Sequence, residues 1–565
     1  MKVNHIHTYI LYVFLGLGML MSTSAQAQDT PTDWEETPTT GQGEIEDAQF
    51  VVVKDREIKL PVMSRPFRKV PPLPQERKSE DLTFSFLETE QKIEAAKPTI
   101  RPLKAKEATL DKLYANYLRA WFGTYGGHGI DLFLHNKRNK YAAYGLGIQH
   151  HGFLRGPVDG GNSEENASTI EGKARFFTKY AEMGAFARYE RNRISYYGYS
   201  PTLSFEDSDS LRQIWNYITL GGHVAGNQTD APLQFRLGAS FESTSNDFTA
   251  KETAARIKWT SSLDLGEPLE ILFDASALLS QYEDITQQNR SLIAFRPALR
   301  YTRDALTVTA GLNAAIENDT LANADQMHIY PRMEAAYQVS EQVRLLANVD
   351  GAIEETTLSS LSRAMPWIEG QSVLAHENRK LSLGASLEAG LSTAVFFKAG
   401  LSYDTRSNAR FFTNAASDST RFAVLYDQGD MNQLTLFAGL NLQVSEAFES
   451  RMDLRYYNYT TDMLAAAWGR PDFQLNWLNT INLYNKIRIK PTLMLMGGID
   501  MLNLQSGTEE TLPLITDLSV QGDYLFSPRA AAWLKVDNIV GGNYERWLNY
   551  PVRGIQFGAG FSYKF

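Results

Sequence analysis

The sequence predicts an all-β fold: a transmembrane, antiparallel, up-and-down β-barrel of about 22 strands that follows an extended, Pro-rich N-terminal arm. Three observations along residues 113–565 predict the barrel. Apolar and polar residues alternate, the alternating segments are long, and the connections between them are alternately short and long.

The alternation is clearest in residues 448–457. Even positions hold Phe, Ser, Met, Leu and Tyr, and odd positions hold Glu, Arg, Asp, Arg and Tyr. Successive side chains of a strand point to opposite faces, so this segment has one apolar and one charged face. The same division recurs in residues 252–264, 269–277, 487–500 and 514–524.

The length of the segments separates a membrane barrel from a soluble sandwich, which also alternates. Many segments run for about 12–15 residues, whereas globular strands usually have ~5–6 and a membrane strand needs ~9–11. We expect tight turns at 136–139, 179–180, 265–267, 340–341, 392–393, 445–446, 485–486 and 527–528, and longer loops at 153–166, 192–210, 354–372, 405–430 and 539–552. Short turns at one end and long loops at the other are typical of outer-membrane barrels.

Residues 1–27 are predicted to be a signal peptide. Lys2 precedes the apolar run 9–21, and Ala25-x-Ala27 forms a cleavage site, so the mature chain is expected to begin near Gln28. The alternative is an uncleaved anchor helix, but the apolar run is shorter than the ~18 residues that a membrane span needs.

Residues 28–112 are predicted to be an extended periplasmic or luminal arm. They hold 9 of the 21 prolines; residues 28–50 carry seven acidic and no basic side chains, and residues 51–80 carry eight Lys or Arg. Such a composition does not support a packed core. Within the arm, Asp47, Phe50, Val51, Val52 and Val53 could form a β-segment that pairs with the sheet edge of a partner, or a short edge strand of no further role.

The composition excludes several functions. Cysteine is absent, which rules out disulfides, thiolate metal sites and cysteine nucleophiles, and the net charge of −10 argues against nucleic acid as a partner. His150 and His151 are neighbours that would face opposite sides of a strand, and no three His converge as zinc requires. We therefore expect no catalytic residue, no metal and no cofactor. Sequence alone leaves open a barrel enzyme with Asp/His or Ser/His pairs on its strands.

Charges of both signs occupy the polar faces of the predicted strands. They include Glu171, Lys173, Arg175, Arg256, Lys258, Arg451, Asp453, Arg455, Lys535 and Asp537. We expect these side chains to line the lumen, where they either bind a polar solute or neutralise one another. A third alternative is that basic residues 54–78 enter the lumen and pair with its carboxylates.

The last strand carries a delivery signal. Phe561, Tyr563 and Phe565 share one face of residues 553–565, and the chain stops on Phe565. An apolar-faced final strand that ends in Phe resembles the C-terminal signal by which outer-membrane proteins reach the barrel-assembly machinery.

The C-terminal region also carries a family resemblance. Its residues are Lys535-Val536-Asp537-Asn538-Ile539, Gly542-Asn543-Tyr544, Tyr550-Pro551-Val552-Arg553-Gly554 and Phe565. With the number and length of the strands, they resemble the barrel of TonB-dependent outer-membrane receptors. Two departures are Ile539-Val540, where Leu-Phe is usual, and Arg553 ahead of Gly554.

The resemblance implies transport across the outer membrane of a Gram-negative bacterium, with lipid and the barrel-assembly machinery as partners. The family also has an N-terminal plug, but residues 28–112 are too short and too Pro-rich for one, so the chain is expected to be a plugless relative. Asp47 and Phe50–Val53 are similar to the family's energy-coupling box. A barrel this wide needs a filler: the arm, inward-folded loops such as 354–372 and 405–430, or a partner.

Two functions follow from these observations. The first is an outer-membrane channel or receptor-type transporter of a polar solute or nutrient. The second is a non-enzymatic scaffold or assembly-complex subunit whose arm, residues 28–112, binds energy-coupling or other envelope proteins.

Overall fold

The computed structural model describes residues 85, 113–200, 203, 211–228, 230–322 and 324–565. The described residues from 113 onwards belong to one compact unit. Its strands are β1 (Asn116–Gly123), β2 (Gly127–His135), β3 (Ala142–Phe153), β4 (Glu165–Phe177), β5 (Ala181–Ser195), β6 (Arg212–Gly226), β7 (Leu233–Asn246), β8 (Lys251–Asp264), β9 (Leu269–Glu283), β10 (Gln287–Arg303), β11 (Leu306–Asp319), β12 (Ala324–Ser340), β13 (Val343–Glu354), β14 (Glu377–Ser392), β15 (Val395–Asn414), β16 (Phe422–Ser445), β17 (Phe448–Thr460), β18 (Phe473–Leu483), β19 (Ile487–Gly497), β20 (Ile499–Asn503), β21 (Thr508–Leu512), β22 (Ile515–Leu525), β23 (Ala530–Asp537), β24 (Glu545–Trp547), β25 (Tyr550–Pro551) and β26 (Gln556–Lys564). Its helices are α2 (Leu358–Ala364) and the short 3-10 turns η1 (Thr124–Gly126) and η2 (Gly160–Ser163).

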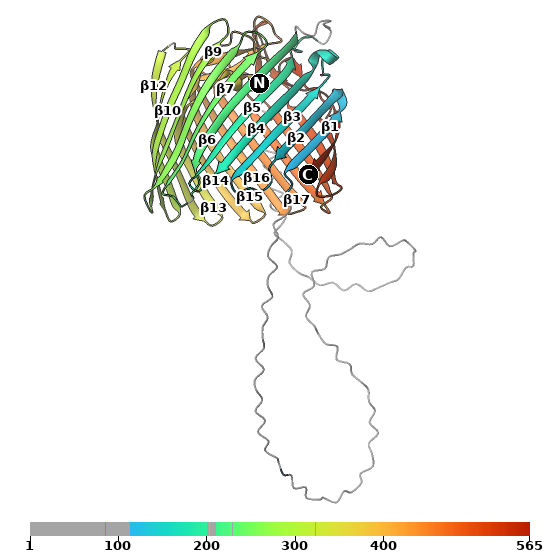
Figure 1. The fold of residues 1–565 in the computed structure, drawn as a ribbon. Coiled ribbons are helices and arrows are strands. Elements are labelled where there is room, and N and C mark those ends of the chain that lie inside the picture. The colour runs from blue at the N-terminus through green and yellow to red at the C-terminus, as the bar shows by residue number, and fades with distance from the viewer. Residues whose placement is uncertain (1–84, 86–112, 201–202, 204–210, 229, 323) are drawn as a thin grey trace, which may run out of the picture. The chain divides into compact units, whose positions relative to one another are not determined.

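Twenty-two of these strands form the wall of a closed antiparallel barrel (Figure 1). β1 pairs with β2 on one side and with the last strand, β26, on the other, so Ala120 lies between Ile130 and Phe561. β20 and β21 form a hairpin outside the strand order of the wall, because β19 pairs directly with β22, and β20 joins the end of β15 through one parallel pair, Asn414 and Asn503. The predicted antiparallel barrel and its strand number are confirmed, whereas the predicted arm stays a prediction. Closure satisfies the backbone groups that an open sheet would leave exposed to lipid.

The two faces of the wall have the predicted characters. On the outer face, Leu454, Leu475 and Leu495 lie in one row across β17, β18 and β19. The adjacent row on the inner face holds Asp453 and Asn476. The outward row is therefore suited to hydrocarbon and the inward row to water.

Aromatic side chains surround the end of the barrel that carries the short turns. Tyr141, Tyr144, Phe176, Tyr180, Tyr337, Tyr484, Tyr524, Phe526, Phe561 and Phe565 are all exposed there. Such a girdle marks the level of the lipid headgroups in outer-membrane barrels. Among the described residues, no helix is long and apolar enough to cross a membrane.

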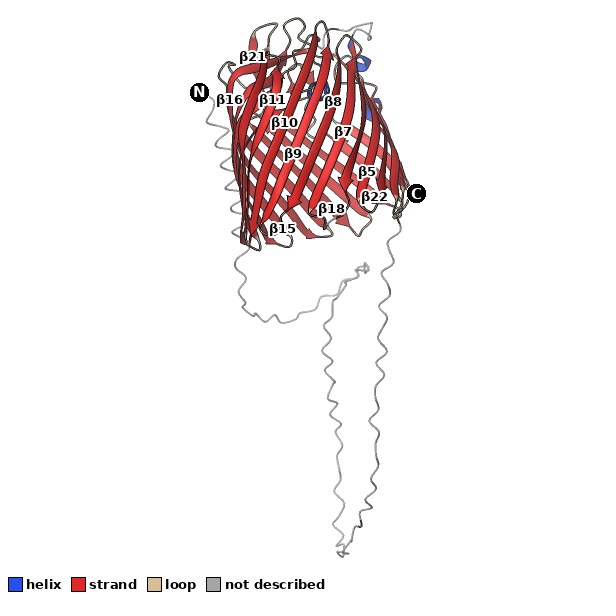
Figure 2. Cartoon of the chain, turned by 60° about the vertical axis from the view of Figure 1, so that its left-hand side comes forward, coloured by secondary structure: helices blue, strands red, loops and turns tan. Residues whose placement is uncertain are grey.

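Both chain ends of the barrel meet at the short-turn end. Asn116 and Phe565 exchange two backbone hydrogen bonds of 3.0 Å. The opposite end carries the longer connections, and we call it the outer mouth, because outer-membrane barrels turn their long loops to the outside (Figure 2).

Two sequence-based boundaries are wrong. Most of the predicted loop 405–430 is strand, because β15 continues to Asn414 and β16 begins at Phe422. A bulge between Ser407 and Ala409 interrupts the alternation there and conceals the strand. The predicted segment 487–500 is divided into β19 and β20 at Gly498, whose φ of +68° favours glycine.

Candidate functional site

The β13–β14 connection, residues 355–376, crosses the outer mouth, and we call it the mouth bridge. The Pro366 carbonyl accepts a 2.9 Å hydrogen bond from Trp215 Nε1 on β6. The carbonyl of the next residue, Trp367, accepts one of 2.9 Å from the backbone N–H of Phe422, where β16 begins. β6 and β16 are ten strands apart in a wall of 22, so the mouth bridge contacts elements that come from nearly opposite sides.

Helix α2 forms the first part of the mouth bridge. Its N-cap is Thr357, whose side chain accepts from the Ser360 N–H while the Ser360 hydroxyl accepts from the Thr357 N–H. This capping box satisfies N–H groups that the first turn leaves without partners. Leu358, Leu361 and Met365 then fall on one side and are at most 1% exposed.

An apolar core joins the mouth bridge to the surrounding elements. The buried residues packed with α2 come from β6, β9, β16, the β19–β22 region and the β24–β25 hairpin: Trp215, Tyr217, Tyr282, Phe422, Ile499, Met501, Leu512, Ile515, Leu548 and Tyr550. Burial of apolar side chains contributes about 1.5–3 kcal/mol each, so this core holds the bridge in place.

The tip of the β15–β16 hairpin, residues 415–421, crosses the same mouth. The Arg421 guanidinium lies 4.7 Å from the Tyr196 ring and 5.1 Å from the Phe248 ring, which belong to the β5–β6 and β7–β8 connections. The Tyr550 hydroxyl donates to the Thr420 carbonyl. Two of the fillers expected from the sequence, loop 354–372 and the tip of the predicted loop 405–430, therefore contribute to the closure of the mouth.

Buried charges anchor both ends of the mouth bridge to the wall. Arg290 on β10 and Glu252 on β8 form a 3.2 Å ion pair, with side chains 1% and 2% exposed. Glu252 also accepts a hydrogen bond from the Leu358 N–H at the start of the bridge. At the end of the bridge, His376 Nδ1 lies 3.1 Å from Arg290 Nη2 and accepts from the Thr356 N–H at 3.0 Å.

These contacts fix the protonation state of His376. Both neighbours of Nδ1 are donors, so Nδ1 is unprotonated and the ring proton is on Nε2. Burial, and then the positive charge of Arg290, lower the pKa of His376 to about 3. The imidazole is therefore neutral at physiological pH.

The middle of the mouth bridge is held by β5 and β6. Arg363 Nη1 lies 2.8 Å from Glu190 Oε1, and the Arg363 guanidinium lies 4.2 Å from the Tyr217 ring. The Tyr217 hydroxyl is 2.9 Å from Ser362 Oγ. The bridge thus combines an apolar core with polar contacts that can exchange with water.

The register places the predicted lumen charges on the face opposite the outward apolar rows. Arg256 pairs with Glu242 at 2.6 Å and with Glu355 of the mouth bridge at 2.5 Å. Three further ion pairs join predicted residues to one another: Glu171–Lys173 at 3.5 Å, Arg451–Asp453 at 3.4 Å and Lys535–Asp537 at 2.9 Å. The predicted Arg175 pairs with Glu182 at 3.8 Å. In the described part of the chain, Lys258 and Arg455 have no ion-pair partner. Most of these charges are therefore locally neutralised.

The remaining predicted residues have diverse positions. Phe561 and Tyr563 lie on the outer face of β26, and the Phe565 ring stacks 5.9 Å from that of Tyr563. Asp47, Phe50, Val51, Val52 and Val53 lie outside the described residues, as does the arm 28–112 apart from Ser85. Within the described ranges, no three His, Asp or Glu side chains are grouped to hold a metal ion.

His150 and His151 point to opposite faces, as the alternation predicts. His150 Nδ1 is 2.8 Å from Ser168 Oγ, whereas His151 Nε2 is 2.8 Å from Asp131 Oδ1. The two imidazoles therefore belong to separate contacts and do not form a common site.

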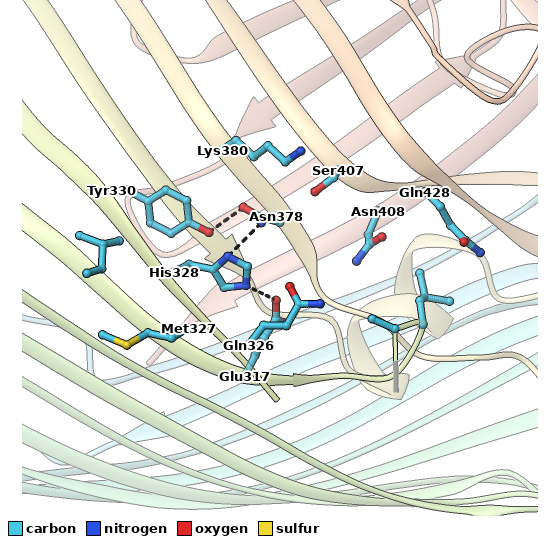
Figure 3. Close-up of a pocket in the computed structure, with 13 residues that line it drawn as sticks. Glu317, Gln326, Met327, His328, Tyr330, Asn378, Lys380, Ser407, Asn408 and Gln428 are labelled. Carbon is cyan, nitrogen blue, oxygen red and sulfur yellow. Dashed lines mark hydrogen bonds and ion pairs between the residues drawn. The ribbon is translucent and has the colours of Figure 1, made fainter. Parts of the chain in front are cut away.

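A polar cavity of about 570 Å³ lies beside the upper part of β12 (Figure 3). The β12–β13 ladder covers only Met333–Ser340 of β12, and the cavity lies beyond it, between β12 and β14–β16. Tyr330 Oη donates to Asn378 Oδ1 at 2.6 Å, and Asn378 Nδ2 is 3.4 Å from His328 Nδ1. These side chains cross-link the wall where the ladder has ended.

A second cavity, of about 430 Å³, lies against the mouth bridge, and we call it the Arg cavity. It is lined by Ala364 of α2 and by Glu354, Glu377, Arg406, Arg410, Phe411, Phe412, Gln433, Trp468, Gly469, Arg470, Pro471, Arg546 and Trp547. Sequence reasoning missed it, because its four arginines come from β15, the β17–β18 connection and β24. The available signals were Trp468-Gly469-Arg470-Pro471 and Arg546-Trp547, where arginine and tryptophan occur together; the second pair falls in the predicted loop 539–552.

No protein-family model and no curated protein matches the sequence. Solved structures match it over most of its length. The FrpB iron transporter from Neisseria meningitidis (F3-3 variant) is 10% identical, with a TM-score of 0.64 over 81% of this chain and 82% of that chain. The siderophore receptor PirA from Acinetobacter baumannii is 9% identical, with a TM-score of 0.63 over 81% of each chain.

The ferripyoverdine receptor of the outer membrane of Pseudomonas aeruginosa is similar as well. It is 10% identical, with a TM-score of 0.60 over 81% of this chain and 72% of that chain. At such low identity the likeness concerns the fold. The chain thus has the 22-stranded barrel fold of TonB-dependent receptors.

Proposed function

We propose that the protein admits a polar solute or nutrient across the outer membrane and that the mouth bridge gates this passage. The observation that carries the proposal is the position of the bridge, which lies across the outer mouth of a wide barrel with a charged inner face. The bridge is joined to the wall by the Arg363–Glu190 ion pair and by the hydrogen bond from the Leu358 N–H to Glu252, as well as by its core. Water can replace those polar contacts when the bridge moves.

The similar structures suggest one class of solute to test. They are described as an iron transporter and siderophore receptors, so ferric chelates are reasonable first candidates. The prediction that the chain has no plug, and those for residues 1–27 and 28–112, concern residues that are not described and stay predictions.

Planar-bilayer recordings of the purified chain test the proposal. In one variant, residues 358–375 are replaced by a short Gly-Ser linker, while Thr357 and His376 are kept. The control shortens the exposed turn of the β20–β21 hairpin at 505–507 and keeps Leu504, whose N–H donates to the Asn414 carbonyl. We expect low or brief conductance for the wild type and the control, and larger, lasting conductance for the bridge replacement. If the replacement conducts no more than the wild type, the gating role is wrong.

The apolar core of the mouth bridge favours a second candidate function. A packed core such as Leu361, Met365, Ile499 and Ile515 is more usual for a permanent closure than for a gate. The barrel would then be a scaffold whose residues 28–112, including Asp47 and Phe50–Val53, bind envelope partners. Absence of solute flux in both the wild type and the bridge replacement would support the scaffold.

A further inference from the structure

We infer that the Arg cavity binds a small organic anion, whose carboxylate or phosphate group pairs with Arg470 and Arg546. The inference rests on the proposed function, because it names the chemical class of solute that the barrel admits.

The four arginines of the cavity form two different pairs. Arg406 and Arg410 have carboxylate partners: Arg406 Nη1 is 2.8 Å from Glu354 Oε2, and Arg410 Nε is 3.0 Å from Glu377 Oε1. Since each of these guanidinium groups already has a carboxylate, neither needs a further anion.

Arg470 and Arg546 have no carboxylate partner in the described part of the chain. Arg470 Nη2 donates to the Arg410 carbonyl at 3.0 Å, and Arg546 Nη2 donates to the Gly469 carbonyl at 3.1 Å. Arg546 Nη1 is buried and has no hydrogen-bond partner among the described residues. Carbonyl oxygens satisfy single N–H groups but do not neutralise the guanidinium charges, and the more distant Glu377 compensates the charge of Arg470 only in part.

The guanidinium charges of Arg470 and Arg546 are largely buried in the Arg cavity. Four guanidinium groups face two carboxylates, so the cavity carries a net charge of +2. Burial lowers the pKa of Arg546 to about 10, with a partly opposing effect of Tyr459, and burial also lowers the pKa of Arg470. A buried charge without a counter-charge is costly, and a bound anion would remove that cost.

Aromatic rings of the cavity orient the two guanidinium groups and indicate which kind of anion would fit. The Arg546 guanidinium lies 4.3 Å from the Trp547 ring, and that of Arg470 lies 4.6 Å from the Phe411 ring. Stacking of this kind leaves the N–H edges available for the bidentate pairing that carboxylates and phosphates make. With Trp468 also in the lining, the cavity suits an anion that has a compact apolar or ring portion.

The cavity is coupled to the mouth bridge by direct contacts. Ala364 of α2 lines it, and Arg410 Nη1 donates to Thr356 Oγ1 of the bridge at 3.3 Å. An anion bound there would therefore touch the element that is proposed to move. The site is placed to detect the solute before or during passage.

Tryptophan fluorescence of the purified full-length chain tests the inference, because Trp468 and Trp547 line the cavity. The probes are benzoate, phenyl phosphate, inorganic phosphate and the neutral analogue benzamide. Arg546→Gln and Arg470→Gln remove the unpaired charges, and Arg546→Lys keeps a charge without the bidentate fork. Arg300→Gln is the matched control, since Arg300 is paired with Glu270 outside this cavity. Heat-modifiable migration in SDS gels checks that each variant is folded.

We expect benzoate or phenyl phosphate to bind the wild type and Arg300→Gln equally, and at least tenfold more weakly to Arg546→Gln and Arg470→Gln. Arg546→Lys should lie between them, and benzamide should not bind. Stronger binding of benzoate assigns a carboxylate ligand, whereas stronger binding of phenyl phosphate assigns a phosphate ligand. Absence of binding, equal binding to the Gln variants, or equal binding of benzamide would overturn the inference.

The binding result and the transport result are separable. If the barrel conducts but no anion binds, the proposed function stands and this inference is wrong. If an anion binds but no solute crosses in bilayers, the site stands and the transport proposal is wrong. Binding of inorganic phosphate alone, unaffected by Arg546→Gln, indicates an adventitious ion only and also overturns the inference.

Discussion

Arg290 and Glu252 form an ion pair of 3.2 Å whose two side chains are almost fully buried. The pair lies where the mouth bridge joins the barrel wall, because Glu252 also accepts from the Leu358 N–H and Arg290 contacts His376. Both ends of a 22-residue connection, residues 355–376, thus depend on one buried pair. This makes the pair a sensitive point for the stability of the bridge.

Glu252→Gln keeps a hydrogen-bond acceptor for Leu358 but leaves the Arg290 charge buried without compensation. Removal of one partner of a buried pair costs about 3–5 kcal/mol. We expect the mouth bridge to loosen and the conversion of the unboiled gel band to occur at lower temperature. Glu270→Gln is the control, because its partner Arg300 is 38% exposed and such pairs contribute about 0–1 kcal/mol. Equal effects of the two substitutions would show that the bridge does not depend on this pair.

Acid is expected to weaken the mouth bridge through His376. Its folded-state pKa of about 3 is below the ordinary 6.5, so the stability it contributes is complete above pH 6.5 and is lost as the pH falls towards 3. Between pH 6.5 and pH 5 the loss is about 2 kcal/mol. His376→Asn keeps an acceptor in place of Nδ1 but does not titrate, so its stability should fall less over this range.

Asp472 also titrates in this pH range, so its effect on stability must be separated from that of His376. Burial, and then the charge of Asp500, raise the pKa of Asp472 to about 6, so its effect on stability has the opposite sign. The difference between wild type and His376→Asn, measured by thermal conversion of the gel band at several pH values, isolates the histidine. Parallel curves for the two proteins would contradict the assigned role.

The outer row Leu454, Leu475 and Leu495 should not tolerate charge. Leu454→Arg or Leu495→Arg is expected to cost about 2–4 kcal/mol, because arginine would face hydrocarbon near mid-strand. Asp453→Asn and Arg488→Gln, on the inner face, should leave folding intact. The heat-modifiable fraction in isolated outer membranes measures the difference. Equal losses on both faces would mean that the faces are assigned in reverse.

Deletion of residues 28–80 tests the predicted arm. If the basic part of the arm lies against the periplasmic mouth or in the lumen, its removal should raise conductance or the permeability of cells to large antibiotics. If both are unchanged and protease cleaves the arm freely in the intact protein, the arm is a solvated tether. The scaffold function would then gain support.

The sequence predicts the strands of the wall well, because the alternation that identifies each strand depends only on neighbouring residues. In residues 448–457 the alternation alone determines which side chains face lipid, and the structure pairs them in that register. The prediction fails at Asn408, where a left-handed residue and a bulge shift the alternation and conceal the extension of β15 and β16. A single residue that departs from the period of two is enough to hide a strand.

The site was less predictable because its contacts are distant in sequence. Trp215 and Pro366 are 151 residues apart, and Arg410 and Arg470 are 60 apart. No spacing rule connects such positions without the barrel's closure. The predicted charges Arg451, Asp453 and Arg455 were recognisable because they lie next to one another on a strand, and this same proximity allows Arg451 and Asp453 to neutralise each other.

An engineered disulfide across the outer mouth tests the gating account most directly. Ile368 of the mouth bridge and Phe422 at the start of β16 form a parallel β-bridge, and adjacent strands lie ~4.8 Å apart, within the reach of a disulfide. The chain has no cysteine, so Ile368→Cys with Phe422→Cys creates the only possible pair. In planar bilayers, oxidation should hold the barrel in its low-conductance state, and reduction should restore openings, while each single variant responds to neither. Openings that persist unchanged in the oxidised protein would contradict the account, because solute would then pass without movement of the bridge.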